Sequence, residues 1–291
     1  MGRTMIDEVL KYCSRNYNRR QKCPDCQNVC QGSCECCLNA IHFCKIYRPY
    51  NCTNIANYYT CKYSCKYSSE IDILLSKLKS LKSYDSFNVL SIGCGPCTDL
   101  MGLYRYIKCE NIDRELTYMG FDMNPIWKSI HLFIISLFES NYSVKIRFSY
   151  SDACISIPRL DLSKITWRPN ILILQYVLSD MNKSGVSIKD FINNLIEKII
   201  PYMPIYSYVI INDINHMETR KWFEYFERIF CKNYTSWKYK GYFKSNTKKS
   251  YSYGTQHDTN KLTCNPPSEI TKFNPWLFCS SAHMVLKKRS E

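Results

Sequence analysis

Short apolar segments alternate with longer helical segments along residues 88–291. Three segments are apolar and rich in β-branched residues, as buried strands are, a fourth leads to an acid, and a fifth alternates apolar and polar residues. The predicted strands cover 89–92, 118–124, 144–148, 171–174 and 208–213, and the predicted helices cover 98–107, 127–138, 188–200 and 218–231. Buried strands separated by helices predict an α/β fold with a doubly wound parallel sheet.

A further helix is predicted over 69–87, ahead of the first strand. Five aliphatic residues of this segment fall on one helical face, at Ile71, Leu74, Leu75, Leu78 and Leu81. We expect this face to pack on the sheet, so that the helix connects the sheet to the residues before it.

Cysteines divide the chain into two parts. Of the 18 cysteines, 11 lie between Cys13 and Cys65. This shift places a boundary near residue 68, between a cysteine-rich module at 1–68 and an α/β domain at 69–291. The chain opens without an apolar signal region, and no apolar run is long enough for a membrane span. We therefore expect a cytoplasmic protein without a membrane partner, whose cysteines bind metal in preference to forming disulfides.

The cysteine-rich module has the residues of several zinc sites. Zinc prefers four thiolate or imidazole ligands, and Cys23-Pro24-Asp25-Cys26 has the short loop of a zinc knuckle. The candidate ligands are Cys23, Cys26, Cys30, Cys34, Cys36, Cys37, His42, Cys44, Cys52, Cys61 and Cys65. At four ligands for each ion they predict about two to three zinc ions. An iron–sulfur cluster, disulfides and plain buried cysteines are the alternatives.

A glycine turn, Gly93-Cys94-Gly95-Pro96-Cys97, follows the first predicted strand. Glycine permits the sharp turn and the close ligand approach of a nucleotide-binding strand–turn–helix. The stretch resembles the first motif of class I S-adenosylmethionine-dependent methyltransferases, in which an acid on an apolar strand precedes G-x-G-x-G. Ser91 stands where that family has the acid, and Cys97 stands where it has the third glycine. The alternative is an ordinary strand–turn–helix without a ligand.

The resemblance implies a Rossmann-like sheet with an antiparallel finish, here at 237–243 and 277–287, and a site for S-adenosylmethionine. It implies that Asp122 binds the ribose hydroxyls, although Asp122 could instead cap the helix that begins near Pro125. It also implies that Asp152 and the Ala153 amide bind the adenine. The implied cofactor-binding residues are Ser91, Gly93, Cys94, Gly95, Asp99, Asp122, Met123, Asp152, Ala153 and Gln175.

Gln175, Tyr176 and Asp180 follow the predicted strand at 171–174. They belong to the edge at which ligands bind in open α/β sheets, so we expect them to orient the methyl acceptor as the catalytic residues. The segment 176–180 is also weakly similar to methyltransferase-like proteins associated with assembly of the mitochondrial small ribosomal subunit. Those proteins likewise carry cysteine metal motifs.

The formal charge of +14 favours an anionic partner. Residues 232–262 contain seven lysines, one acid and interleaved aromatic residues. Lysines contact phosphates and aromatic rings stack on unpaired bases, so a nucleic acid, RNA first, is the expected partner. The candidate contacts are Lys244, Lys248, Lys249, Tyr251 and Tyr253. An equal alternative is that the rings pack on the sheet while the lysines are solvated.

These features together predict an S-adenosylmethionine-dependent methyltransferase that acts on RNA or another nucleic acid. Methyl transfer is an in-line displacement, which depends more on positioning than on an acid–base pair. One alternative is a non-catalytic binding or assembly factor that kept the fold, which Ser91 and Cys97 favour. The other is a small-molecule or protein methyltransferase with a structural zinc module.

Overall fold

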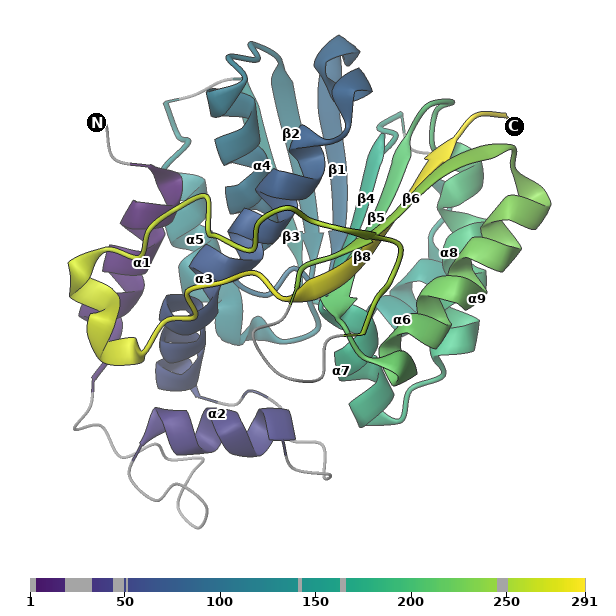
Figure 1. Cartoon of the computed structure of the whole chain (residues 1–291). Helices are drawn as coiled ribbons and strands as arrows, with labels where there is room; N and C mark the ends of the chain where they lie inside the picture. The colour runs from purple at the N-terminus through teal and green to yellow at the C-terminus, as the bar shows by residue number, and fades with distance from the viewer. Residues whose placement is uncertain are drawn as a thin grey trace.

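The computed structural model of the chain describes residues 4–18, 33–43, 50, 52–140, 143–162, 166–244 and 251–290. These residues form an eight-stranded sheet with helices on both faces (Figure 1). The helices are α1 (Met5–Asn16), α2 (Cys34–Phe43), α3 (Thr53–Ser76), α4 (Thr98–Cys109), α5 (Lys128–Ser136), α6 (Ala153–Ser156), α7 (Val177–Ser184), α8 (Ile188–Lys198) and α9 (Met217–Asn233). The strands are β1 (Ser86–Ile92), β2 (Glu115–Phe121), β3 (Val144–Ser149), β4 (Ile171–Gln175), β5 (Tyr208–Ile214), β6 (Ser236–Tyr242), β7 (Thr255–Gln256) and β8 (Ser281–Lys288).

The strand order of the sheet is β3-β2-β1-β4-β5-β8-β6-β7. β1 pairs in parallel with both β2 and β4, and β3 and β5 extend the parallel sheet on the two sides. β8 runs antiparallel between β5 and β6. This arrangement confirms the predicted Rossmann-like sheet with an antiparallel last strand. The order reverses between β1 and β4, and ligands of such sheets bind at this point, beyond the carboxyl ends of the strands.

Two hydrophobic layers cover the sheet. On one face α1, α3, α4 and α5 pack around residues such as Leu10, Ile71 and Leu103, and on the other face α8 and α9 contribute Phe191 and Phe223 (Figure 1). Every residue of β4 is buried, as is every residue of β5 except the last. Burial on both faces explains why these strands are continuous apolar runs in the sequence.

The long helix α3 joins the N-terminal residues to the sheet. It begins at Thr53, well before the predicted start at residue 69, and it crosses residue 68 without a break. It packs along α4, where Gly102 allows a close approach: a Cβ there would lie 2.4 Å from the backbone oxygen of Ser68. α1, whose N-terminus Thr4 and Asp7 cap reciprocally, packs on α3. The described residues before and after residue 68 therefore share one core.

The other elements lie close to their predicted positions. β4, β5 and α8 begin at the predicted residues, whereas the helix expected over 127–138 is a 3₁₀ turn (Pro125–Trp127) followed by α5. The helices α1, α2, α6 and α7 and the two-residue strand β7 were not predicted. No helix of the described residues is both long enough and apolar enough to cross a membrane.

Candidate active site

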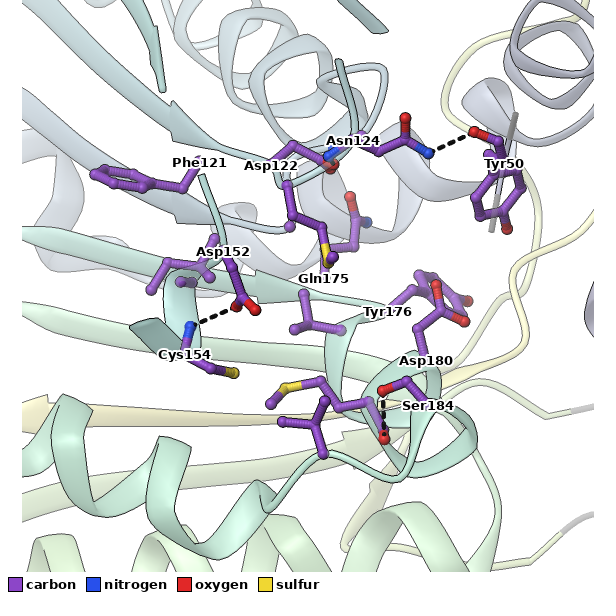
Figure 2. Close-up of a pocket in the computed structure, with 18 of the residues that line it drawn as sticks. Tyr50, Phe121, Asp122, Asn124, Asp152, Cys154, Gln175, Tyr176, Asp180 and Ser184 are labelled. Atoms are coloured by element: carbon purple, nitrogen blue, oxygen red, sulfur yellow. Dashed lines mark hydrogen bonds between the residues drawn. The ribbon is translucent and has the colours of Figure 1, made fainter. Parts of the chain in front are cut away.

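A cavity of about 390 Å³ lies at the carboxyl ends of β1, β2 and β4 (Figure 2). This volume is in the range of small-ligand sites. One end of the cavity is lined by residues of the strand ends, and the other by aromatic and charged residues from α3, α7 and the segments around them. The lining residues include Gly93, Gly95, Asp122, Met123, Asp152, Ala153, Gln175, Tyr176, Asp180 and Lys183, with Tyr50, Tyr59 and Trp127.

The turn after β1 has the backbone conformation that glycine permits. Gly93 and Gly95 have φ angles of 66° and 47°. A Cβ on Gly95 would meet no atom within 4 Å, and Gly95 lines the cavity, so a side chain there would take up ligand space. Cys97 also has a positive φ, 61°, which costs a residue with a Cβ about 1–2 kcal/mol. The chain thus keeps a glycine-like conformation at a position occupied by cysteine.

Asp122, directly after β2, is bound to this turn. Its Oδ2 accepts a hydrogen bond from the Gly95 amide at 2.8 Å, and its Oδ1 accepts one from the Asn124 amide at 2.8 Å. Burial raises the pKa of Asp122, and the two amides oppose that rise. Each carboxylate oxygen has two lone pairs, so Asp122 retains acceptor capacity on the cavity wall. Vicinal hydroxyl groups of a ribose would need such acceptors.

Asp152 lies on the wall after β3. It caps the short helix α6, where its Oδ1 accepts a hydrogen bond from the Cys154 amide at 2.8 Å. Ala153 lines the cavity beside it, as does Met123, whose side chain is exposed. The structure therefore brings seven of the residues expected to bind cofactor to one cavity: Gly93, Gly95, Asp122, Met123, Asp152, Ala153 and Gln175. Their contacts with a cofactor stay a prediction.

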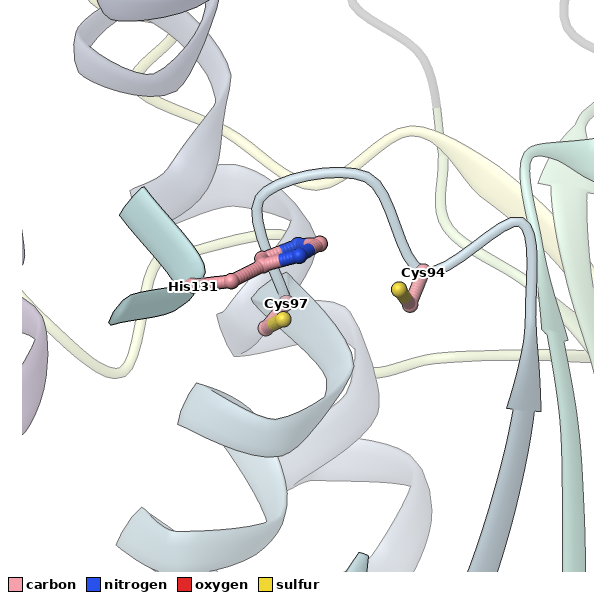
Figure 3. Close-up of side chains that lie close together, drawn as sticks. All are labelled: Cys94, Cys97 and His131. Carbon is pink, nitrogen blue, oxygen red and sulfur yellow. The ribbon is translucent and has the colours of Figure 1, made fainter. Parts of the chain in front are cut away.

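Ser91, Asp99 and Cys94 lie behind the turn and are not part of the cavity wall. Ser91 and Asp99 are buried, and the Asp99 carboxylate accepts hydrogen bonds from the Tyr118 hydroxyl at 3.0 and 3.2 Å. Burial raises the pKa of Asp99, while hydrogen bonds from Ser91 and then Tyr118 oppose the rise. The serine that replaces the family's acid is therefore engaged inside the protein. The thiol of Cys94 lies near Cys97 and His131 (Figure 3).

Gln175 and Tyr176 are on the wall, but their polar groups are used in the interior. Gln175 Oε1 accepts from the Thr98 hydroxyl at 2.8 Å, and its Nε2 donates to the backbone oxygen of Tyr67 at 2.9 Å. The Tyr176 hydroxyl donates to Glu70 Oε2 at 2.9 Å, and its ring stacks on Tyr67 with centroids 4.0 Å apart. These contacts make both side chains fixed parts of the wall.

Glu70 of α3 fixes the wall around Tyr176 through buried polar contacts. Its side chain is fully buried and pairs with Lys66 at 3.1 Å. It also accepts hydrogen bonds from the Asn212 side chain at 3.1 Å and from the amides of Ser280 and Ser281 at 2.9 and 3.2 Å. A buried carboxylate needs such partners, and here they come from segments far apart in the sequence. The sequence alone gave no signal for this role of Glu70.

Asp180 lines the cavity as Gln175 and Tyr176 do, but unlike them it is exposed. The protein packed around its carboxyl raises the pKa to about 7, an effect that Lys183 opposes and Asp213 reinforces. Burial, and then the Asp180 carboxylate, raise the pKa of Tyr50 and Tyr59, and both phenols line the same cavity. A carboxyl with a pKa near neutrality can take up a proton from a reacting group.

Three aromatic rings form the cavity wall near Asp180. The ring centroids of Tyr50 and Tyr59 are 5.5 Å apart, and Trp127 lies 5.7 Å from Tyr50 and 5.5 Å from Tyr59. The Asn124 side chain donates to the backbone oxygen of Tyr50 at 2.6 Å, and this hydrogen bond links the aromatic wall to the end of β2. These rings were not predicted as site residues, since the tyrosine-rich composition around them indicates no particular site.

α2 is also held near this end of the cavity. Lys183 of α7 donates to the backbone oxygen of His42 at 2.9 Å, and Ile41 lines the cavity. The His42 ring contacts the hydroxyls of Tyr50 at 2.9 Å and Tyr63 at 3.2 Å. Burial lowers the pKa of His42 to about 4, so the ring is neutral at physiological pH. The N-terminal segment thus contributes to the site by packing.

The predicted zinc ligands are only partly described. Cys23, Cys26, Cys30 and Cys44 lie outside the described residues, whereas Cys34, Cys36, Cys37 and His42 are on α2, Cys52 precedes α3, and Cys61 and Cys65 are buried in α3. The Cys61 thiol donates to the backbone oxygen of Leu10 at 3.7 Å, and that of Cys264 donates to the backbone oxygen of Cys65 at 3.6 Å. Across the described ranges, no three of these candidates gather at ligand distance. The zinc module stays a prediction.

The proposed nucleic-acid face is also described only in part, since Lys248 and Lys249 lie outside the described residues. Lys244 and Tyr251 are exposed, whereas Tyr253 is buried in the core. Lys238 and Lys240, expected to add to the positive charge, pair with Glu227 at 2.6 and 2.5 Å. The positive charge of this face is therefore smaller than the sequence suggests.

Comparisons with known proteins give structural likeness only. No family model matches the chain, and no curated protein matches it. The solved plantazolicin methyltransferase BpumL, in complex with a monoazolic desmethylPZN analog and SAH, is 14% identical over 98% of this chain and 100% of its own, with a TM-score of 0.47. A methyltransferase from Pyrococcus furiosus is 12% identical over 74% of this chain and 83% of its own, with a TM-score of 0.40.

A third likeness is to a Listeria monocytogenes protein assigned as a class I S-adenosylmethionine-dependent methyltransferase. It is 13% identical over 76% of this chain, with a TM-score of 0.44, and this chain spans 59% of its length. At these identities and TM-scores the likenesses carry no argument for an activity.

Proposed function

We propose that the protein is an S-adenosylmethionine-dependent methyltransferase. The observation that carries this proposal is Asp122, held by the Gly95 amide at 2.8 Å on the wall of a cavity at the carboxyl edge of the sheet. The cavity fits the cofactor in two further respects. The open side of Gly95 leaves room for a ligand against the backbone, and Asp152 lies on the same wall for a ring amino group.

Each residue at the end of the cavity formed by the glycine turn and the strand ends has a separate binding role. Asp122 would accept hydrogen bonds from the ribose hydroxyls, and Asp152 from the adenine amino group. Gly95 would admit the cofactor against the turn, because no side chain stands between the turn and the cavity. When bound, S-adenosylmethionine supplies an electrophilic methyl group on a sulfonium. The contribution of the chain is to hold the two partners in line and to exclude water.

The other end of the cavity would receive the acceptor. Tyr50, Tyr59 and Trp127 provide an apolar wall for a flat or apolar group, and Asp180 stands beside them. A hydroxyl or protonated amine must lose a proton on methylation, and an Asp180 oxygen with a pKa of about 7 would take it up. Gln175 and Tyr176, bound in the interior, would shape the wall instead of acting on the acceptor.

RNA is the acceptor class that we place first. The net charge of +14 favours a polyanion, and Tyr251 offers an exposed ring at the carboxyl edge of the sheet. The Asn215 side chain, just beyond β5, donates to the Tyr251 backbone oxygen at 2.8 Å, and the Arg220 guanidinium lies 5.7 Å from its ring. A ring and a cation at the edge that carries the cavity could bind single-stranded RNA near the site.

A non-catalytic binding factor is the second candidate, and Ser91 is the observation that favours it. Its hydroxyl is engaged with Asp99 inside the protein, so the acid that the family has at this position is missing from the cavity wall. Incubation with radiolabelled S-adenosylmethionine and total RNA separates the two candidates. Label in RNA that is lost in Asp180→Asn supports the enzyme, whereas cofactor binding without transfer to RNA, protein or small molecules supports the binding factor.

A further inference from the structure

Two thiols and an imidazole converge behind the glycine turn, outside the cavity (Figure 3). Cys94 and Cys97 are separated in the sequence by Gly95 and Pro96, and His131 comes from α5. One ligand atom from each of the three residues lies within 4.8 Å of the other two. Over the described ranges this is the only such group of three residues, and none of them belongs to the cysteine run at 13–65.

The three side chains are buried and held in place. Cys94, Cys97 and His131 are 5%, 0% and 1% exposed. The His131 ring stacks on Phe148 with centroids 3.9 Å apart. Its Nε2 lies 2.6 Å from the backbone oxygen of Gly95, and its Nδ1 lies 3.0 Å from the Tyr150 hydroxyl. Binding of a metal at either ring nitrogen would replace one of these hydrogen bonds and leave the other to orient the ring, as is usual for histidine ligands.

The backbone makes room for this group at some cost. A Cβ on Gly120 of β2 would lie 2.9 Å from the Cys94 sulfur and 2.9 Å from the Phe148 ring, so only glycine fits beneath the thiol. Cys97 has the left-handed conformation that glycine adopts more easily, yet it is a cysteine with its thiol in the cluster. Strained residues persist where surrounding contacts fix them, and they concentrate at functional sites.

We propose that Cys94, Cys97 and His131 bind one zinc ion. Two thiolates and one imidazole are ligands that zinc prefers, and bond lengths of about 2.3 Å to sulfur place two zinc-bound sulfurs about 3.8 Å apart. The ligand atoms of the cluster lie within 4.8 Å of one another, and metal binding would draw them to this spacing. A water molecule would complete the tetrahedron, and the two thiol protons would pass to solvent on binding. The histidine distinguishes this site from a cysteine pair that forms a disulfide, because a disulfide does not require a neighbouring imidazole.

The ion would also fix the turn that faces the cavity. It would join the two ends of the Cys94–Cys97 loop to α5, and this loop carries the Gly95 amide that donates to Asp122. Zinc would therefore strengthen cofactor binding without touching the cofactor. This second part rests on the proposed function, whereas zinc binding itself does not.

The test compares the zinc content of purified full-length variants by elemental analysis. Cys97→Gly is the most informative change, because glycine relieves the positive φ and so retains the fold while it removes a ligand. We expect Cys97→Gly, Cys94→Ser and His131→Gln each to contain about one zinc ion fewer than the wild type. Cys109→Ser and Cys231→Ser, which alter exposed cysteines elsewhere, should match the wild type. Differences between variants are used because the cysteine run at 13–65 is expected to hold zinc of its own.

Cobalt(II) provides a second readout. Reconstitution with cobalt should give a thiolate-to-metal charge-transfer band that is weaker in Cys97→Gly than in the wild type. Equal zinc content and equal cobalt spectra in folded wild type and Cys97→Gly would overturn the proposal. A Cys94–Cys97 disulfide, seen by peptide mapping of protein isolated with its thiols blocked, would also overturn it. If the zinc results hold but S-adenosylmethionine fails to bind, the metal site stands and the proposed function fails.

The coupling between zinc binding and cofactor binding is tested by a separate measurement. A chelator should lower the affinity of the wild type for S-adenosylmethionine and leave that of Cys97→Gly unchanged. An equal loss of affinity in both proteins would show that a zinc ion at Cys94, Cys97 and His131 does not strengthen cofactor binding.

Discussion

The two ends of the cavity are built in different ways. At the end formed by the glycine turn, the backbone of Gly95 and the carboxylates of Asp122 and Asp152 make a polar wall. At the other end, aromatic rings including Tyr59 share the wall with Asp180, which has a raised pKa. The polar wall comes from the ends of neighbouring parallel strands, whereas the aromatic end is assembled from α3, α7 and segments beside them.

This difference assigns separate tasks to the two ends. The carboxyl ends of parallel strands meet at one edge, so the fold itself supplies the polar end. The aromatic end depends on residues added around the sheet, and we expect it to select the acceptor. Changes at the polar end should then weaken cofactor binding, and changes at the aromatic end should slow methyl transfer while cofactor affinity is kept.

Gly95→Asp should have the largest effect and abolish binding of S-adenosylmethionine. The new side chain would enter the cavity and place a negative charge beside Asp122. Gly185→Asp is the matched control, because Gly185 also has a positive φ, 74°, with open space at its Cβ, but does not line the cavity. Calorimetry on both variants makes the comparison. Equal losses in the two would show that backbone strain is responsible.

Asp180→Asn should slow methyl transfer by about 10²–10⁴-fold, the usual contribution of a general base. Cofactor affinity should change little. Below a pH of about 7 the Asp180 carboxyl is protonated and cannot accept a proton, so the wild-type rate should rise with pH through that value and then level off. The variant should lack this rise.

Carbon-13 NMR of aspartate-labelled protein checks the same group without an acceptor. A carboxyl signal that titrates near pH 7 and is missing from Asp180→Asn would confirm the assignment. A rate that is unchanged in Asp180→Asn would contradict the role of Asp180 even if the titration is seen.

Asp122→Ala should weaken S-adenosylmethionine binding by about 1–3 kcal/mol, the range for losing hydrogen bonds to a charged group. Asp113→Ala removes an exposed carboxylate away from the cavity and should leave affinity unchanged. The measurement is calorimetric titration with thermal unfolding alongside, since Asp122 also binds two backbone amides. Full affinity in a folded Asp122→Ala protein would place the ribose elsewhere.

Tyr251→Ala should have the smallest effect, a loss of about 1 kcal/mol in affinity for single-stranded RNA if the ring stacks on a base. The dependence on salt should stay as in the wild type, because salt acts on phosphate contacts. Tyr206→Ala is the matched control, since Tyr206 is exposed on another loop. No RNA binding by the wild type at low ionic strength would rule out this face and RNA as the acceptor.

The sheet and the polar end were predictable from the sequence, and most of the aromatic end was not. The strands and the positions of Gly95, Asp122 and Asp152 follow from local apolar runs and the residues directly after them, whereas the order of the strands and the antiparallel finish follow from the resemblance to class I methyltransferases. Tyr50 and Tyr59 come from a segment whose cysteine spacing suggested only metal binding, and contacts with Asn124 and Trp127 bring them to the cavity. Such tertiary contacts have no local sequence signal.

Direct titration of the wild-type protein with S-adenosylmethionine tests the central claim most simply. We predict saturable binding at one site, competition by S-adenosylhomocysteine, and no competition by NAD, because Thr98 replaces the third glycine of the dinucleotide motif. Absence of binding by folded protein at millimolar cofactor, or equal competition by NAD, would contradict the assignment of this cavity to S-adenosylmethionine.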